Sequence, residues 1–176
     1  MALFGSTCVA LFGASAAYHY FDLGERGNKV LRRIDHAAIF LFIAGSYFPP
    51  LIHTLDGAWR ITMMAVIASI GLAGVIMKVF WVGGPRWLTV GIYLAMGWMV
   101  VIPGYLVLPR LPTWGLVWLV AGGLAYSLGA VVYARKWPDP LPGVFGHHEV
   151  WHLFVLAGAA FHFGAMASLI PAEVPS

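Results

Sequence analysis

The chain consists of six long apolar stretches separated by short polar connections. A window of about 20 residues, the length that crosses a bilayer as a helix, places them at roughly 2–21, 36–55, 61–77, 87–108, 114–134 and 149–170. The period-two alternation of a membrane β-barrel is absent from them. Because only helices and closed barrels satisfy their backbone polar groups in lipid, each stretch is predicted to be a membrane-spanning helix.

The connections leave no room for a separate soluble domain. They carry turn residues, as in Gly83-Gly84-Pro85 and Pro138-Asp139-Pro140. Residues 1–176 are therefore predicted to form one membrane-embedded domain, an all-α, polytopic helical bundle with six spans.

The composition excludes an ordinary soluble protein. Hydrophobic residues make up 61% and charged residues 10% of the chain, whereas soluble domains are about half apolar and about one quarter charged. The only cysteine, Cys8, excludes an internal disulfide framework. The isoelectric point near 9.2 raises nucleic acid as a partner, but the basic residues form no stripe, so no nucleic-acid partner is expected.

The positions of the lysines and arginines predict the orientation. Cytoplasmic loops carry the excess of these residues, and the first, third and fifth loops hold eight of the ten: Arg26, Lys29, Arg32, Arg33, Lys78, Arg86, Arg135 and Lys136. These loops are predicted to be cytoplasmic, with both termini outside. An outside N-terminus that enters a span without a basic signal region leads us to expect that a preceding span is missing, or that the start was assigned too late.

Ionisable residues gather at the predicted cytoplasmic ends of three spans. By span, they are His19, with Ser15 one turn before it; Asp35 and His36; and His148, Glu149 and His152. An ionisable group inside a membrane is costly, so this gathering at one depth indicates a functional site.

The pattern favours a zinc site. His148 and His152 are four residues apart on a helix, which directs both imidazoles the same way. His19 would complete a three-nitrogen set with a fourth position open to water, as in catalytic zinc sites. Asp35 is predicted to accept a hydrogen bond from the water or from a ligating histidine, and Ser15 to position substrate or water. Zinc would lower the pKa of that water to about 7.

Simpler interpretations stay open for the single residues. A histidine at a membrane interface is often only an amphipathic anchor, and Asp35 beside Arg32 and Arg33 would suit an interfacial ion pair. His162 lies about 15 Å along the helix from His152, too far to share its metal, and is expected to bond a neighbouring helix.

The segment 148–152 also matches H-E-x-x-H, the metalloprotease motif in which the glutamate is the general base. Intramembrane metalloproteases take a third ligand from an Asp-Gly pair. Here Asp56-Gly57 precedes the histidine motif and is predicted on the opposite membrane face. A protease is therefore the less favoured alternative.

Taken together, these motifs resemble the hemolysin III family, the bacterial branch of the progestin and adipoQ receptor group. The strings that carry the resemblance are SAAYH at 15–19, RIDHAAI at 33–39, AGSYFP at 44–49, HEVWH at 148–152 and GAAFHF at 158–163. The resemblance covers nearly the whole chain and implies a protein of the bacterial plasma membrane.

The resemblance also implies a seven-helix bundle that holds Zn²⁺ with three histidines near the cytoplasmic face. They correspond to His19, His148 and His152, and in the similar adiponectin receptors an aspartate at the position of Asp35 contacts the zinc-bound water. Those receptors have no glutamate at the position of Glu149, so the shared chemistry does not require it. Six spans are predicted here where the family has seven, so the first family span is expected to be missing.

Two functional classes follow from this resemblance. One is a zinc-dependent hydrolase of a membrane lipid amide or ester, as in the related ceramidases; Ser15, Asp35 and the open zinc position favour it. The other is a non-enzymatic protein, either a pore-forming, membrane-lytic hemolysin or a membrane-homeostasis factor, with structural zinc. The sequence shows no polar stripe that would line a pore.

Overall fold

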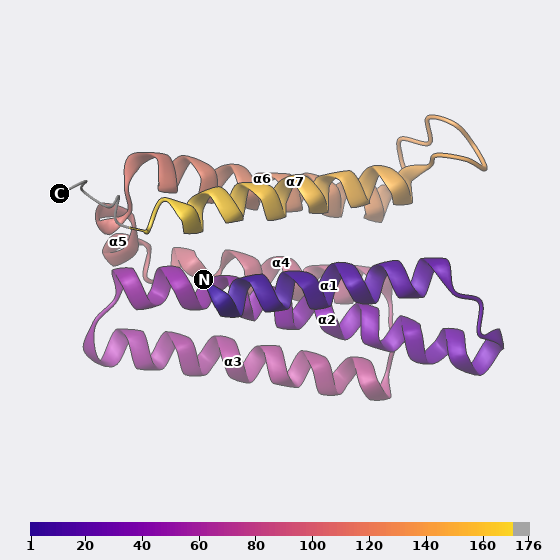
Figure 1. Ribbon diagram of the computed structural model, residues 1–176, viewed down its shortest axis with the longest axis horizontal. Coiled ribbons are helices and arrows are strands. Elements are labelled where there is room, and N and C mark those ends of the chain that lie inside the picture. The colour runs from indigo at the N-terminus through magenta and orange to yellow at the C-terminus, as the bar shows by residue number, and fades with distance from the viewer. Residues whose placement is uncertain (171–176) are drawn as a thin grey trace. The chain divides into compact units, whose positions relative to one another are not determined.

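The computed structural model describes residues 1–170, which are helical with short connections (Figure 1). The helices are α1 (Ala2–Tyr20), α2 (Gly24–Thr54), α3 (Gly57–Phe80), α4 (Arg86–Gly97), η1 (Trp98–Val101), α5 (Gly104–Val107), η2 (Leu108–Arg110), α6 (Thr113–Arg135) and α7 (His147–Ala167). Within residues 1–170 the only β-type pairing is an isolated bridge between Leu141 and Phe145. The prediction of an all-α membrane bundle is confirmed.

Each of the six predicted stretches is helical, but they differ in how well they suit a membrane span. Four helices, α2, α3, α6 and α7, are long and apolar enough to cross a bilayer. The segments Arg86–Val101 and Gly104–Arg110 meet at 47° and make a fifth span if they are counted as one. Helix α1 has 19 residues and is not among these, because its last turn carries Tyr18, His19 and Tyr20.

By its internal contacts the chain divides into two compact units, Met1–Pro85 and a second that begins at Arg86. In the first unit α2 packs against both α1 and α3 (Figure 1). Glycines permit the closest approaches: a Cβ at Gly45 would collide with Thr7 of α1, and one at Gly74 would collide with the ring of Phe40. Phe40 is fully buried, so these two points fix α2 between its neighbours.

In the second unit α6 and α7 lie side by side (Figure 1). Gly158 of α7 faces the ring of Tyr126, and Gly129 of α6 faces Phe154, so small residues again allow close helix contact. Helix α4 joins this pair, and Trp98 Nε1, in the turn that follows it, donates a hydrogen bond to Ser127 Oγ of α6 at 3.0 Å. Within this unit α7 is therefore held by extensive packing on α6.

Candidate metal centre

The first two turns of α7 carry the histidine pair. The helix starts at His147, directly after Gly146, whose backbone N–H donates a hydrogen bond to Glu149 Oε2 at 2.8 Å. A carboxylate in this position satisfies one of the N–H groups that a helix start leaves without a partner. Glu149 therefore caps the helix that presents His148 and His152.

The two imidazoles converge on one point. His148 Nε2 and His152 Nε2 are 3.1 Å apart, and the ring planes are nearly perpendicular at 86° with centroids 4.6 Å apart. Two ligand nitrogens on a tetrahedral zinc, each about 2.0–2.1 Å from the ion, are separated by about 3.3 Å. The donor type and the spacing of this pair thus fit one edge of a zinc coordination tetrahedron.

Aromatic side chains enclose the pair within the second unit. The Trp151 ring lies 5.5 Å from His148 and 4.6 Å from His152. Tyr133 of α6 contacts both Trp151, at 5.1 Å, and His148, at 6.2 Å. Arg86 in turn lies over the Tyr133 ring at 5.7 Å. These contacts limit the rotation of the histidine rings. Trp151 and Tyr133 were not predicted as site residues.

The first unit carries the remaining predicted residues. His19 is exposed in the last turn of α1, where its ring contacts Tyr18 at 4.9 Å, and Ser15 is half-buried one turn earlier. Asp35 is buried in α2, with 8% of its surface exposed. Its carboxylate Oδ2 lies 3.3 Å from His36 Nδ1.

The structure answers one of the open alternatives for Asp35. Within residues 1–170 its ion-pair partner is His36, the next residue in the chain, and not Arg32 or Arg33. A pair of a buried carboxylate and an imidazole differs from a surface pair of a carboxylate and an arginine. The arginine is always charged, whereas the imidazole carries a charge only when it is protonated.

The structure thus brings His148 and His152 together in the second unit, and Asp35 and His36 together in the first. Ser15 and His19 also belong to the first unit. The joining of His19 to the histidine pair stays a prediction, as do the roles of Ser15 and Asp35.

Two other residues lie apart from these groups. His162 packs against Gly122 and the Tyr126 ring of α6, whose centroid lies 5.3 Å from its own. Asp56 pairs with Arg60 at 2.7 Å at the start of α3. Asp56 therefore lies between the end of α2 and the start of α3, 21 residues after Asp35, and forms an ion pair there.

Comparisons with known proteins agree with the motifs. The model of the haemolysin-III related family matches residues 1–163. A hemolysin-3 homolog of Bacillus subtilis is 34% identical over 92% of this chain and 72% of its own length. Hemolysin-3 of Bacillus cereus is 37% identical over 77% of this chain and 59% of its own length. The adiponectin receptor protein of Drosophila melanogaster is 26% identical over 92% of this chain, which spans 40% of that receptor. The chain belongs to the haemolysin-III related family.

Proposed function

We propose that this chain binds Zn²⁺ through His19, His148 and His152 and hydrolyses an amide or ester of a membrane lipid. The proposed site lies at the cytoplasmic face of the bacterial plasma membrane, according to the distribution of basic residues. The observation that carries the proposal is the convergence of His148 Nε2 and His152 Nε2 at a spacing suited to zinc.

Zinc bound by three histidines supplies a Lewis acid and a water of lowered pKa. In this proposal, His148 and His152 of α7 would hold the zinc ion. Glu149 caps the start of this helix, and the Trp151 ring contacts the His152 ring. His19 is the third proposed ligand. Its side chain is exposed on the last turn of α1.

Asp35 is the proposed proton acceptor. Its buried carboxylate takes the proton from the attacking water and passes it to the leaving amine or alcohol. His36 Nδ1 lies 3.3 Å from the carboxylate oxygen Oδ2. Ser15, half-buried one turn from His19, orients the substrate carbonyl through its hydroxyl group.

A second candidate function rests on the curated relatives. The Bacillus cereus protein is named hemolysin-3 and the Bacillus subtilis protein a hemolysin-3 homolog. These names favour membrane lysis, in which zinc would be a structural ion. The two functions differ in what they require: hydrolysis needs the carboxylate of Asp35, whereas lysis needs only the folded, metal-bound bundle.

The testing experiment is elemental analysis of the full chain purified in detergent. We expect about one zinc per chain in the wild type, because three imidazoles suffice for a catalytic site, and loss of zinc in His19→Ala, His148→Ala and His152→Ala. His147→Ala is the matched control, since it removes a neighbouring histidine of the same helix turn. Unchanged zinc in His152→Ala, or a wild type without metal, would overturn the site.

A further inference from the structure

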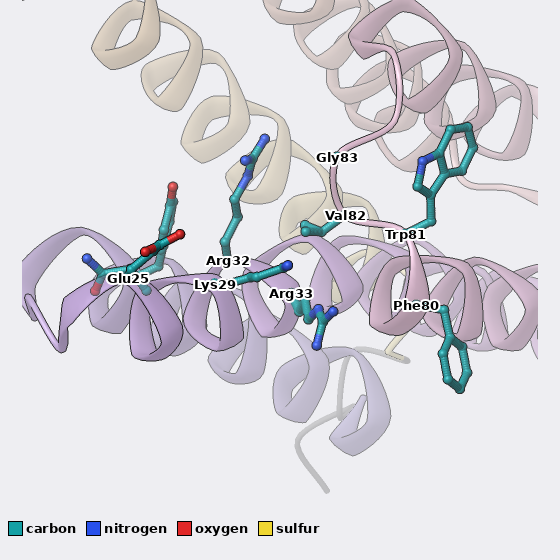
Figure 2. A pocket seen from close by; sticks show the side chains of 10 residues that line it. Glu25, Lys29, Arg32, Arg33, Phe80, Trp81, Val82 and Gly83 are labelled. Carbon is teal, nitrogen blue, oxygen red and sulfur yellow. The ribbon is translucent and has the colours of Figure 1, made fainter.

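A cavity of about 480 Å³ lies within the first unit, at the start of α2 and the end of α3 (Figure 2). Helix α2 contributes Lys29, Arg32 and Arg33, and the segment 80–83 that ends and follows α3 forms the other wall. Cavities of about 300–1,000 Å³ are of the size that holds small molecules. The zinc proposal above uses none of these residues.

The cavity is positively charged. Its lining has three basic side chains and a single acid, Glu25. Within residues 1–170, Lys29, Arg32 and Arg33 form no ion pair. Arg33 Nε is shielded from solvent and has no hydrogen-bond acceptor in the described part of the chain. A buried donor of this kind is normally satisfied, which points to an acceptor that the polypeptide does not supply.

The length of α2 indicates the depth of the cavity in the membrane. Its 31 residues extend for about 46 Å, whereas the hydrocarbon core is about 30 Å thick. The first turns of α2, which hold the basic side chains, therefore extend into the headgroup region. Phe80 and Trp81 line the cavity from the end of α3 and are exposed, as in the aromatic belt of a membrane interface.

We propose that this cavity binds the phosphate of an anionic phospholipid headgroup. The planar guanidinium groups of Arg32 and Arg33 suit two-point hydrogen bonding to phosphate oxygens, and Lys29 adds a mobile point charge. Figure 2 shows Lys29, Arg32 and Arg33 extending from one stretch of α2. Basic pockets between membrane helices at the cytoplasmic side are known to take such headgroups.

The acid and the aromatic side chains favour a lipid over free phosphate. Inorganic phosphate carries between one and two charges near pH 7, whereas a phosphodiester carries one, and the Glu25 carboxylate in the same lining disfavours the second charge. Phe80 and Trp81 offer apolar surface to a glycerol backbone and acyl chain. Free phosphate has no group that would use this surface.

The test is thermal unfolding of the full chain in mixed detergent micelles that contain either phosphatidylglycerol or phosphatidylcholine. Saturating phosphatidylglycerol is expected to raise the unfolding midpoint by roughly 5 °C, because a ligand stabilises the state that binds it. The double variant Lys29→Gln/Arg32→Gln should lose most of this shift. Arg32→Lys, which keeps the charge, should retain part of it.

Arg26→Gln is the matched control, because Arg26 lies on the same helix but does not line the cavity. It should keep the shift of the wild type. An equal loss in Arg26→Gln would mean nonspecific surface charge and overturn the site. An equal shift with phosphatidylcholine, or with inorganic phosphate at the same phosphate concentration, would overturn the anionic-lipid assignment. The midpoint without lipid shows whether each variant folds, and zinc content does not enter the readout.

Discussion

At the residue scale, the proposed chemistry depends on a carboxylate that the fold keeps away from water. Asp35 is buried in α2 and faces His36 Nδ1 at 3.3 Å. Burying an acidic side chain costs desolvation free energy, so an ionisable residue inside a membrane protein marks a candidate functional site. The neighbouring residues Ala37 and Ala38 are also buried but carry no polar side-chain group.

Asp35→Asn separates hydrolysis from metal binding. The amide keeps the size of the side chain but cannot accept a proton, so lipid hydrolysis should fall by about 10²–10⁴-fold. Zinc content should stay at the wild-type level, because Asp35 is not a proposed ligand. The measurement pairs elemental analysis with mass spectrometry of lipid products. Loss of zinc would make Asp35 a ligand, and hydrolysis at the wild-type rate would remove its catalytic role.

The histidine spacing is the part of the site that could be predicted from residues alone. The i, i+4 rule places His148 and His152 on one helix face without knowledge of the fold. The contacts of Trp151 and Tyr133 could not be predicted, because they depend on how α6 packs against α7. The cavity at Arg32 and Arg33 also escaped prediction, since it combines two segments about 50 residues apart in sequence.

At the element scale, the first turn of α7 contains Glu149, which caps the start of the helix. Glu149 accepts a hydrogen bond from the Gly146 backbone N–H, so it stabilises the turn that carries the proposed ligand His148. This contact accounts for the glutamate of the H-E-x-x-H string without assigning it a part in catalysis.

Glu149→Gln is the variant that distinguishes a cap from a general base. The amide oxygen of glutamine can still accept the hydrogen bond from Gly146, so zinc content and hydrolysis should stay close to the wild type. A general base would instead lose about 10²–10⁴-fold in rate on the same change. Glu149→Ala, which removes the acceptor, should weaken zinc binding. A rate collapse in Glu149→Gln with zinc retained would restore the protease-like assignment.

Helices α2 and α3 approach closely at Gly74, which has no side chain. A methyl group at Gly74 would collide with the buried ring of Phe40. Gly74→Ala should therefore cost about 1–3 kcal/mol by overpacking and lower the unfolding midpoint by several degrees. Gly13→Ala in α1, where a methyl group meets nothing within 4 Å, is the control and should leave the midpoint unchanged or raise it. Equal midpoints for the two variants would contradict the packing.

Helix positions were predictable, but their ends were not. Hydropathy predicts a helix over 36–55, whereas α2 begins twelve residues earlier at Gly24. The added turns are rich in charge, and a search for apolar windows passes over them, although they continue the same helix in the headgroup region. The stretch 87–108 is apolar throughout and was predicted as one span, yet the helix breaks between Gly97 and Gly104. Pro103 lacks the backbone N–H that an uninterrupted helix would need there.

At the scale of the whole molecule, the chain is built as two units in sequence order. Helices α1 to α3 complete their mutual packing within residues 1–85, and the helices from Arg86 onward pack among themselves. The prediction of one membrane-embedded domain stays untested by this division. The sequence offered one hint of it, the turn at Gly83-Gly84-Pro85, but apolar periodicity does not show which helices pack together.

The division into two units has a consequence for biosynthesis. Helices α1 to α3 pack against one another within residues 1–85, so this packing can form while the residues from Arg86 onward are still being translated. At about 5–20 residues per second, translation from Arg86 to His152 takes about 3–13 seconds. During that time His19 and the Arg32 cavity already exist, but His148 and His152 do not. Metal binding at the proposed site would therefore have to wait until α7 has been translated, whereas the proposed lipid cavity could form earlier.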